Sequence, residues 1–293
     1  MSIIGLSHWT LLVTDLDRSS RFYADVMGWR RLPVDAGSGA APLPTVRFVR
    51  DGQRVELAPL PSAARSSPPE VHHLGHSHMT VATGPARATM KRLAEHGVRV
   101  REHTLSSFVA RQEADGSQFL FEDPDGNIIE TFAAGPDWNP FGTGHSDSDG
   151  GSPAGIMHLS HWSLCVADPE RSLPFYRDVL GWTELMRLDW EGSGPSRVMD
   201  VGPARLTTWL FGSDGQRIEI IHFYEPPSPL RPDRGAPGLS HLSVLVDDVP
   251  LSAAELRASG IDTTVAEGTL RFADPDGNTI VGLERSEATR WAV

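Results

Sequence analysis

A tandem repeat is the sequence feature that most constrains the fold of this chain. Residues 8–29 recur at residues 161–182, with thirteen of the 22 positions identical. Three further pairs follow in the same order: DGQRVEL (51–57) with DGQRIEI (214–220), GHSHMTV (75–81) with GLSHLSV (238–244), and FEDPDGN (121–127) with FADPDGN (272–278). A repeat that keeps its order across both halves indicates a tandem duplication.

Each half of the chain is itself doubled. Four serine–histidine pairs open apolar, strand-like runs, and each run leads to a helical segment that ends near a glycine. The pairs are Ser7-His8, Ser77-His78, Ser160-His161 and Ser240-His241, and the expected helices are 18–26, 86–95, 170–179 and 251–258. Shorter strands follow each helix, and Asp-Gly in the two DPDG segments is a turn signal. The pattern predicts an α+β fold of four βαβββ units, paired into two cupped-sheet domains.

A segment between the halves has the composition of a linker. Residues 134–155 are rich in Gly, Pro, Ser and Asp and lack hydrophobic periodicity. We therefore expect an N-terminal domain of two units over residues 1–134 and a linker over residues 135–155. A C-terminal domain of two units is expected over residues 156–293.

Composition excludes several classes of partner. The net charge is −12 without a Lys/Arg cluster, which argues against nucleic acid and anionic membranes as partners. No apolar run approaches the roughly 18–20 residues of a membrane helix, and the N-terminus lacks the features of a signal peptide. The single cysteine, Cys165, cannot form an internal disulfide. We expect a cytoplasmic monomer or homodimer that acts on a small molecule.

Four residues of the first half form a candidate metal site. His8 lies on the opening strand and Glu56 on the closing strand of the first unit, and His78 and Glu130 hold these places in the second unit. If these two units pair, two imidazoles and two carboxylates meet in one cup. That donor set suits a divalent ion such as Zn, Ni, Co, Mn or Fe(II). Four protein ligands would leave two octahedral positions for adjacent oxygens of a substrate.

The second half departs from this pattern. His161, Glu219 and His241 are retained, but Val281 stands where Glu130 stands in the first half. One interpretation is a site that binds no metal. The other is a site of two histidines and one carboxylate, the composition of a non-haem Fe(II) oxygenase centre. The intact quartet predicts that the first half is the functional centre.

The motifs resemble those of the vicinal oxygen chelate superfamily. They are the His-led strand, the FYxDVxGW end of the helix and the DPDGNIIE segment at 123–130, and they cover nearly the whole chain outside the linker. The superfamily includes glyoxalase I, methylmalonyl-CoA epimerase, extradiol dioxygenases and antibiotic resistance proteins. In its glyoxalase-like members the metal ligands fall where His8, Glu56, His78 and Glu130 fall here.

The resemblance implies three alternative activities. The first is a glyoxalase-, lyase- or epimerase-like reaction through a metal-stabilised enediolate, with Glu56 or Glu130 as general base. The second is an Fe(II)-dependent dioxygenase of the extradiol or hydroxyphenylpyruvate type. Extradiol enzymes take their carboxylate from the closing strand of the fourth unit, the place that Val281 occupies here. The third is a non-enzymatic resistance protein that binds an antibiotic.

Overall fold

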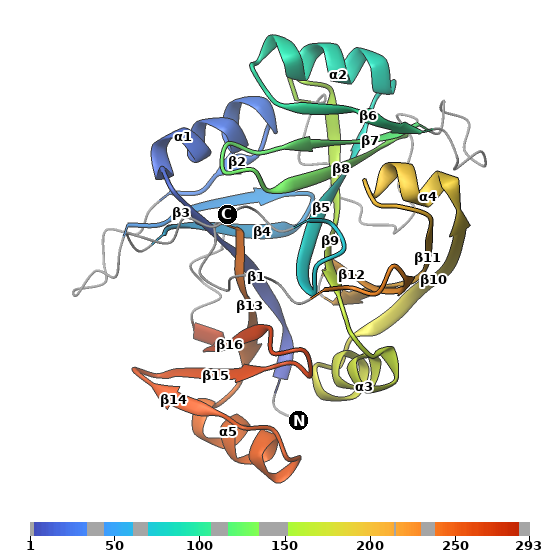
Figure 1. The fold of residues 1–293 in the computed structure, drawn as a ribbon. Coiled ribbons are helices and arrows are strands. Elements are labelled where there is room, and N and C mark those ends of the chain that lie inside the picture. Colours follow the sequence, from blue (N-terminus) through green and yellow to red (C-terminus); the bar gives the residue numbers. More distant parts are fainter. Residues whose placement is uncertain are drawn as a thin grey trace.

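Two eight-stranded sheets organise the computed structural model (Figure 1). The structure describes residues 3–33, 44–60, 70–106, 117–134, 152–213, 215–229 and 238–286. Sheet A has the order β14-β15-β16-β13-β1-β4-β3-β2 and sheet B the order β10-β11-β12-β9-β5-β8-β7-β6. The strands of sheet A are β1 (Ile3–Val13), β2 (Arg30–Arg31), β3 (Val46–Arg50), β4 (Gln53–Pro59), β13 (Gly238–Val246), β14 (Thr264–Ala266), β15 (Thr269–Ala273) and β16 (Thr279–Glu284). Those of sheet B are β5 (Gly75–Thr83), β6 (Val100–Ser106), β7 (Gln118–Glu122), β8 (Ile128–Ala133), β9 (Ile156–Cys165), β10 (Thr183–Gly192), β11 (Ala204–Ser213) and β12 (Gln216–Glu225).

The units pair across the two halves of the chain. Sheet A joins the first unit to the fourth, because β1 runs antiparallel to β13. Sheet B joins the second unit to the third, because β5 runs antiparallel to β9. The four units and two cupped sheets are confirmed, but the expected pairing of the first unit with the second is wrong. Of the expected linker, residues 135–151 lie outside the described part of the chain.

The helices lie close to their expected positions. Asp15, Asp168 and Asp248 cap α1 (Leu16–Arg21), α3 (Pro169–Pro174) and α5 (Val249–Ala258) by accepting a backbone N–H in the first turn. The first and third helices continue as single π-helical segments, η1 (Phe22–Val26) and η2 (Phe175–Val179). Helix α2 spans Ala86–Glu95, and a short helix α4 spans Ser193–Val198. No helix in the described ranges is long and apolar enough to cross a membrane.

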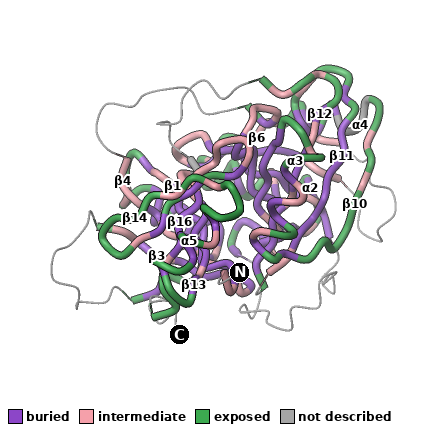
Figure 2. Tube along the Cα trace, turned by 90° about the horizontal axis from the view of Figure 1, so that it is seen from below, coloured by how far each residue is buried: buried purple, intermediate pink, exposed green. Residues whose placement is uncertain are grey.

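One apolar core joins the backs of both sheets to the helices. Trp9 of β1 and Trp162 of β9 are almost fully buried and stack with ring centroids 5.5 Å apart. Burial is concentrated in the strands, whereas β10 and the outer turns are exposed (Figure 2). The opposite face of each sheet, which carries the histidine of each opening strand, forms a cup. We name these faces cup A and cup B after their sheets.

A buried tyrosine–aspartate hydrogen bond links the two units within each half. Tyr23 of η1 donates to Asp123 in the first DPDG turn at 2.8 Å, and Tyr176 of η2 donates to Asp274 in the second at 2.6 Å. Burial raises the pKa of Asp123 to about 6, although hydrogen bonds from Asn127 and Tyr23 lower it. Helix-to-turn contacts therefore hold each half together, while strand pairing holds the two halves to each other.

Candidate functional site

The structure divides the predicted quartet between the two cups. His8 and Glu56 lie on β1 and β4 of sheet A, whereas His78 and Glu130 lie on β5 and β8 of sheet B. The expected meeting of all four in one cup is therefore wrong, because each unit pairs with a unit of the other half. The first half therefore has no cup of its own, and the prediction that it is the functional centre stays a prediction.

The three corresponding residues of the second half, His161, Glu219 and His241, are also divided between the two cups. As a result, two of them join His78 and Glu130 to form a different quartet. His161 and Glu219 lie on β9 and β12 of sheet B, while His241 lies on β13 of sheet A. Cup B therefore brings His161 and Glu219 to His78 and Glu130. Cup A brings His241 to His8 and Glu56, with Val281 in the fourth place. Two histidines and two glutamates do meet in one cup, but they come from the second and third units.

The four polar groups of cup B are in mutual contact. His78 Nε2 lies 3.3 Å from Glu130 Oε2 and 3.8 Å from Glu219 Oε2. His161 Nε2 lies 3.5 Å from Glu219 Oε2. The His78 side chain is fully buried, whereas those of Glu130 and Glu219 keep 7% and 14% of their surface exposed. The quartet is therefore deep in the cup but not sealed from solvent.

The preceding serine fixes the orientation of His78. Ser77 Oγ donates its proton to the Val71 carbonyl, so it must accept from His78 Nδ1, which is 2.7 Å away. His78 Nε2 then faces Glu130 and Glu219, and it also lies 3.1 Å from Ser163 Oγ. The same serine-to-Nδ1 contact recurs in the other three units at 2.8–3.2 Å, at His8, His161 and His241.

Hydroxyl groups hold the two carboxylates of cup B in a symmetric way. Thr80, two residues after His78, donates to Glu130 Oε2 at 3.0 Å. Ser163, two residues after His161, donates to Glu219 Oε2 at 3.0 Å. Burial alone would raise the pKa of Glu219, but the nearby His161 and His78 rings and the hydroxyl of Ser163 lower it to about 2.

The chemistry of this donor set fits a divalent cation. Two carboxylates and two imidazole nitrogens, His78 Nε2 and His161 Nε2, face one another at 3.3–3.8 Å. Carboxylate oxygens and imidazole nitrogens are donors that divalent ions such as Zn prefer in proteins, and binding an ion there would release the protons of the rings. Donor atoms at about 2.0–2.2 Å from one ion lie roughly 3.0–3.4 Å apart, close to the observed separations.

The cluster is not a formed coordination shell. Within the described ranges, no three or more His, Cys, Asp or Glu side chains are arranged so that they could hold a metal ion as they stand. The donor groups of cup B touch one another, so binding an ion would require small side-chain rotations. The fit therefore rests on the type and spacing of the donors.

Apolar side chains form the walls of cup B. They make a separate buried cluster on the face of the sheet opposite Trp162. The cluster comprises Val71, Leu120, Ile128, Cys165, Met199, Ala204, Leu206, Ile221 and Phe223. Burial raises the pKa of the Cys165 thiol, which makes this cysteine a wall residue rather than a nucleophile. Water is thus excluded from most of the surface around the quartet.

Cup A has a different chemical character. Arg47 Nε donates to Glu56 Oε2 at 3.0 Å, and Thr45 Oγ1 donates to the same oxygen at 3.3 Å. Burial, followed by the charges of His241 and Arg47, lowers the pKa of His8 well below its usual range. Burial and the charge of Arg271 lower the pKa of His241 to about 4. Both imidazoles are therefore neutral at pH 7.

The DGQR motifs contribute residues whose role the sequence did not predict. Gln53 Nε2 donates to the Leu159 carbonyl at 2.8 Å, just before the serine–histidine pair of β9. Reciprocally, Gln216 Nε2 donates to the Ser7 carbonyl at 2.6 Å in β1. Each glutamine thus braces the histidine strand of the other sheet. Their identity in both repeats was the available signal.

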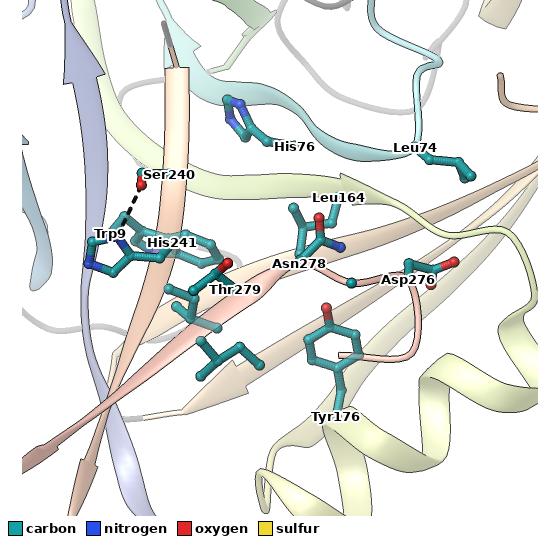
Figure 3. A pocket seen from close by; sticks show the side chains of 13 residues that line it. Trp9, Leu74, His76, Leu164, Tyr176, Ser240, His241, Asp276, Asn278 and Thr279 are labelled. Carbon is teal, nitrogen blue, oxygen red and sulfur yellow. Dashed lines mark hydrogen bonds between the residues drawn. The ribbon is translucent and has the colours of Figure 1, made fainter. Parts of the chain in front are cut away.

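A cavity of about 280 Å³ lies where the sheets meet. Figure 3 shows His241 and Ser240 on one side of it, with His76, Asn278, Asp276 and Tyr176 around the remainder. Trp9 and Leu164 of the common core also line it. His241 therefore lies at the boundary between cup A and a second polar space.

Comparison with known proteins identifies the family. Four βαβββ units, paired into two cupped sheets with a histidine on each opening strand, define a glyoxalase-type fold. The sequence model of the Glyoxalase/Bleomycin resistance protein/Dioxygenase superfamily matches residues 5–131 and 158–281. The chain belongs to this superfamily.

Individual relatives carry different activities in their names. The chain is 31% identical over 142 residues to a catechol-2,3-dioxygenase of Bacillus subtilis (strain 168), a match covering 46% of this chain and 44% of that protein. It is 27% identical over 267 residues to an iron-dependent extradiol dioxygenase of Rhodococcus jostii (strain RHA1), covering 86% of this chain and 76% of that one. A glyoxylase I 4 of Arabidopsis thaliana is 28% identical over 140 residues, covering 44% of this chain and 71% of the relative.

Solved structures support the fold over the whole chain. Glyoxalase I from Zea mays has a TM-score of 0.63 at 17% identity, with 98% of this chain and 93% of that chain covered. A putative dioxygenase from Bacillus subtilis has a TM-score of 0.56 at 16% identity, with 97% and 86% covered. At these identities the likeness concerns the fold alone.

Proposed function

We propose that cup B is an active centre in which His78, Glu130, His161 and Glu219 hold one divalent cation. The protein would then be a lyase or isomerase that acts, through an enediolate, on a small molecule with two adjacent oxygens. The observation that carries this proposal is the convergence of two carboxylates and two imidazoles from the four adjacent strands β12, β9, β5 and β8. A divalent ion bound there would act as a Lewis acid and would stabilise negative charge on the two oxygens.

The carboxylates differ in their suitability as general base. Glu219 accepts from Ser163 and contacts both histidines, whereas the polar partners of Glu130 among the described residues are Thr80 and His78. Glu130 is therefore less constrained and can turn toward a substrate carbon. It would remove a proton next to the carbonyl and return it to the adjacent carbon.

The walls of the cup restrict the class of substrate. Leu120, Ile221 and Phe223 belong to the buried apolar cluster beside the quartet. A substrate with an apolar or aromatic body beside two vicinal oxygens would bury its body there. The same walls would keep bulk water from protonating an enediolate before the transfer is complete.

A second candidate function is Fe(II)-dependent dioxygenation. It is favoured by the two relatives named as catechol or extradiol dioxygenases, one of which matches over 86% of this chain. It is opposed by Val281, because the closing strand of the fourth unit lacks the carboxylate that extradiol enzymes use. In addition, Glu56, the carboxylate remaining in cup A, is held by Arg47.

Metal analysis of the full chain, purified without added metal, tests these proposals. We expect one ion per chain, lost in Glu130→Gln and in Glu219→Gln and retained in the matched cup A variant Glu56→Gln. Zn, Ni or Co with turnover of α-oxo aldehyde adducts would support the lyase or isomerase. Iron with oxygen uptake on a catechol panel would favour the dioxygenase instead.

A third outcome would reject both enzymes. If no metal binds under any loading condition and His78→Ala does not alter ligand binding, cup B is not a metal centre. Tight binding of an aromatic antibiotic by that metal-free protein would then indicate a sequestering function.

A further inference from the structure

Cup A carries arginines at two positions where cup B carries leucines. In cup B, Leu210 of β11 is the cross-strand partner of Glu219 on β12. Leu120 of β7 is the cross-strand partner of Glu130 on β8. The same positions in cup A are occupied by arginines, because Arg47 lies across from Glu56 and Arg271 lies across from Val281. The cup with one carboxylate fewer has thus gained two guanidinium groups.

Strand alternation places both arginines inside cup A. The neighbours of Arg47, Val46 and Phe48, belong to the common core on the other face of the sheet. The neighbours of Arg271, Leu270 and Phe272, belong to it as well. Since successive side chains of a strand point to opposite faces, the two guanidinium groups face the cup. Their charges also lower the pKa of His8 and His241.

Two buried hydroxyl groups in cup A have no partner. Thr10 lies across from Glu56 and Ser243 across from Val281, the places that Ser163 and Thr80 hold in cup B. Both side chains are nearly fully buried, and neither hydroxyl has a hydrogen-bond partner among the described residues. A buried hydroxyl without a partner is unfavourable, and a ligand with acceptor oxygens would supply the missing hydrogen bond.

We infer that cup A is a binding site for a small organic carboxylate and not a second metal site. Arg47 and Arg271 together outnumber the single carboxylate of Glu56, and Arg54, which lies two residues before Glu56 on the same face of β4, adds positive charge beside His8, so the site suits an anion. The planar forks of Arg47 and Arg271 match the oxygens of a carboxylate. The hydroxyls of Thr10 and Ser243 and the neutral rings of His8 and His241 supply further hydrogen bonds. The inference does not depend on the function proposed for cup B.

A cation would be poorly held in cup A. Glu56 already accepts from Arg47 and Thr45, and Val281 supplies no donor atom. The positive charges of Arg47 and Arg271 beside the two histidines would repel a divalent ion. Charge and donor chemistry thus favour an anion over a metal at the same position in the fold.

Calorimetric titration of the full chain tests this site. The chain is first treated with a chelator, so that an ion in cup B cannot bind the probe. The probes are the sodium salts of acetate, pyruvate and benzoate, with inorganic phosphate as the doubly charged comparison. We expect one carboxylate per chain, bound more tightly than phosphate. Arg271→Gln should weaken binding by about 10–100-fold, while Glu130→Gln in cup B leaves it unchanged.

Arg271 is exposed, so its substitution should leave the fold intact, as a thermal melt would show. The inference is overturned if no carboxylate binds at millimolar concentration, or if Arg271→Gln binds it as tightly as the wild type. Stronger binding of phosphate would also overturn the choice of a carboxylate. A second divalent ion per chain, lost in His241→Ala, would show that cup A is a metal site after all.

Discussion

Thr80 Oγ1 donates a 3.0 Å hydrogen bond to Glu130 Oε2 from the neighbouring strand. This bond orients one carboxylate of cup B toward His78. Thr10 lies opposite Glu56 in cup A, where Arg47 and Thr45 hold that carboxylate and the Thr10 hydroxyl has no hydrogen-bond partner in the described part of the chain.

The first prediction follows from this pair of threonines. Thr80→Val keeps the shape of the side chain but releases Glu130, so the metal affinity of cup B should fall by about 10–100-fold. The matched substitution Thr10→Val should not change it. Competition with a chromogenic chelator measures both affinities. Equal affinities for the two variants would contradict the assigned role of the hydroxyl.

Removing the hydroxyl of Tyr23 should destabilise the chain. In Tyr23→Phe the buried Asp123 loses a donor at 2.8 Å, and we expect the free energy of unfolding to fall by about 1–3 kcal/mol. Tyr176→Phe is the matched variant and should cost a similar amount, because Asp274 holds the equivalent place. Urea unfolding monitored by tryptophan fluorescence gives both values. A loss below about 0.5 kcal/mol in both would refute the prediction.

The pH dependence of stability should carry the signature of Asp123. Its folded pKa of about 6 lies above the ordinary value of 3.8, so the folded state binds the proton more tightly. The stabilising contribution is fully present below about pH 3.8 and is lost as the pH rises through 6. The wild type should therefore lose up to roughly 3 kcal/mol between pH 4 and pH 7 relative to Asp123→Asn. A constant difference between the two proteins over this range would rule out the assigned shift.

Asp200 should control access to cup B. It accepts from Arg101 at 2.9 Å and is 2.8 Å from His103 Nε2, both on β6. The flanking residues Met199 and Val201 cover the apolar wall of the cup. Asp200→Asn should loosen this segment, which we expect to increase hydrogen exchange after α4 and to raise KM several-fold.

A control for that variant lies on the adjacent strand. Asp189 of β10 accepts from Thr207 and Arg187 within sheet B, so Asp189→Asn removes a comparable charge away from the cup. Unchanged exchange and KM in Asp200→Asn, with the thermal melt preserved, would mean that the Asp200 contacts do not govern access.

Cup A should become a metal site when its three differences from cup B are reversed. In the combined variant Arg47→Leu, Arg271→Leu and Val281→Glu, the new carboxylate would accept from Ser243 as Glu130 accepts from Thr80. We expect the metal content to rise from one to two ions per chain. Metal analysis at saturating Zn measures the number of ions per chain. A folded variant that still binds one ion would contradict this prediction.

The elements of the fold were predictable because they depend on local sequence. Helix α2 begins and ends where its helical segment and Gly97 indicated, and Asp15 caps α1. The four serine–histidine pairs and the two DPDG turns lie on the strands and turns that their patterns indicated. These features depend on residues only a few positions apart.

The sequence predicted that two histidines and two glutamates meet in one cup, but it did not predict which units supply them. All four opening strands carry the same Ser-His pattern, so each can form the same antiparallel pair with any other. Contacts far apart in the sequence settle the choice, such as the stacking of Trp9 on Trp162 and the bonds from Gln53 and Gln216 to the other sheet. The sequence of a single unit does not indicate which other unit it pairs with.

The pairing of β1 with β13 also has a consequence for the order of folding during synthesis. Strand Ile3–Val13 leaves the ribosome long before its antiparallel neighbour Gly238–Val246 has been synthesised. Until then the nascent chain exposes an apolar strand with an open edge, which invites pairing with other chains. Because such long-range pairing also slows folding, this protein should depend on chaperones more than a chain whose neighbouring units pair in sequence.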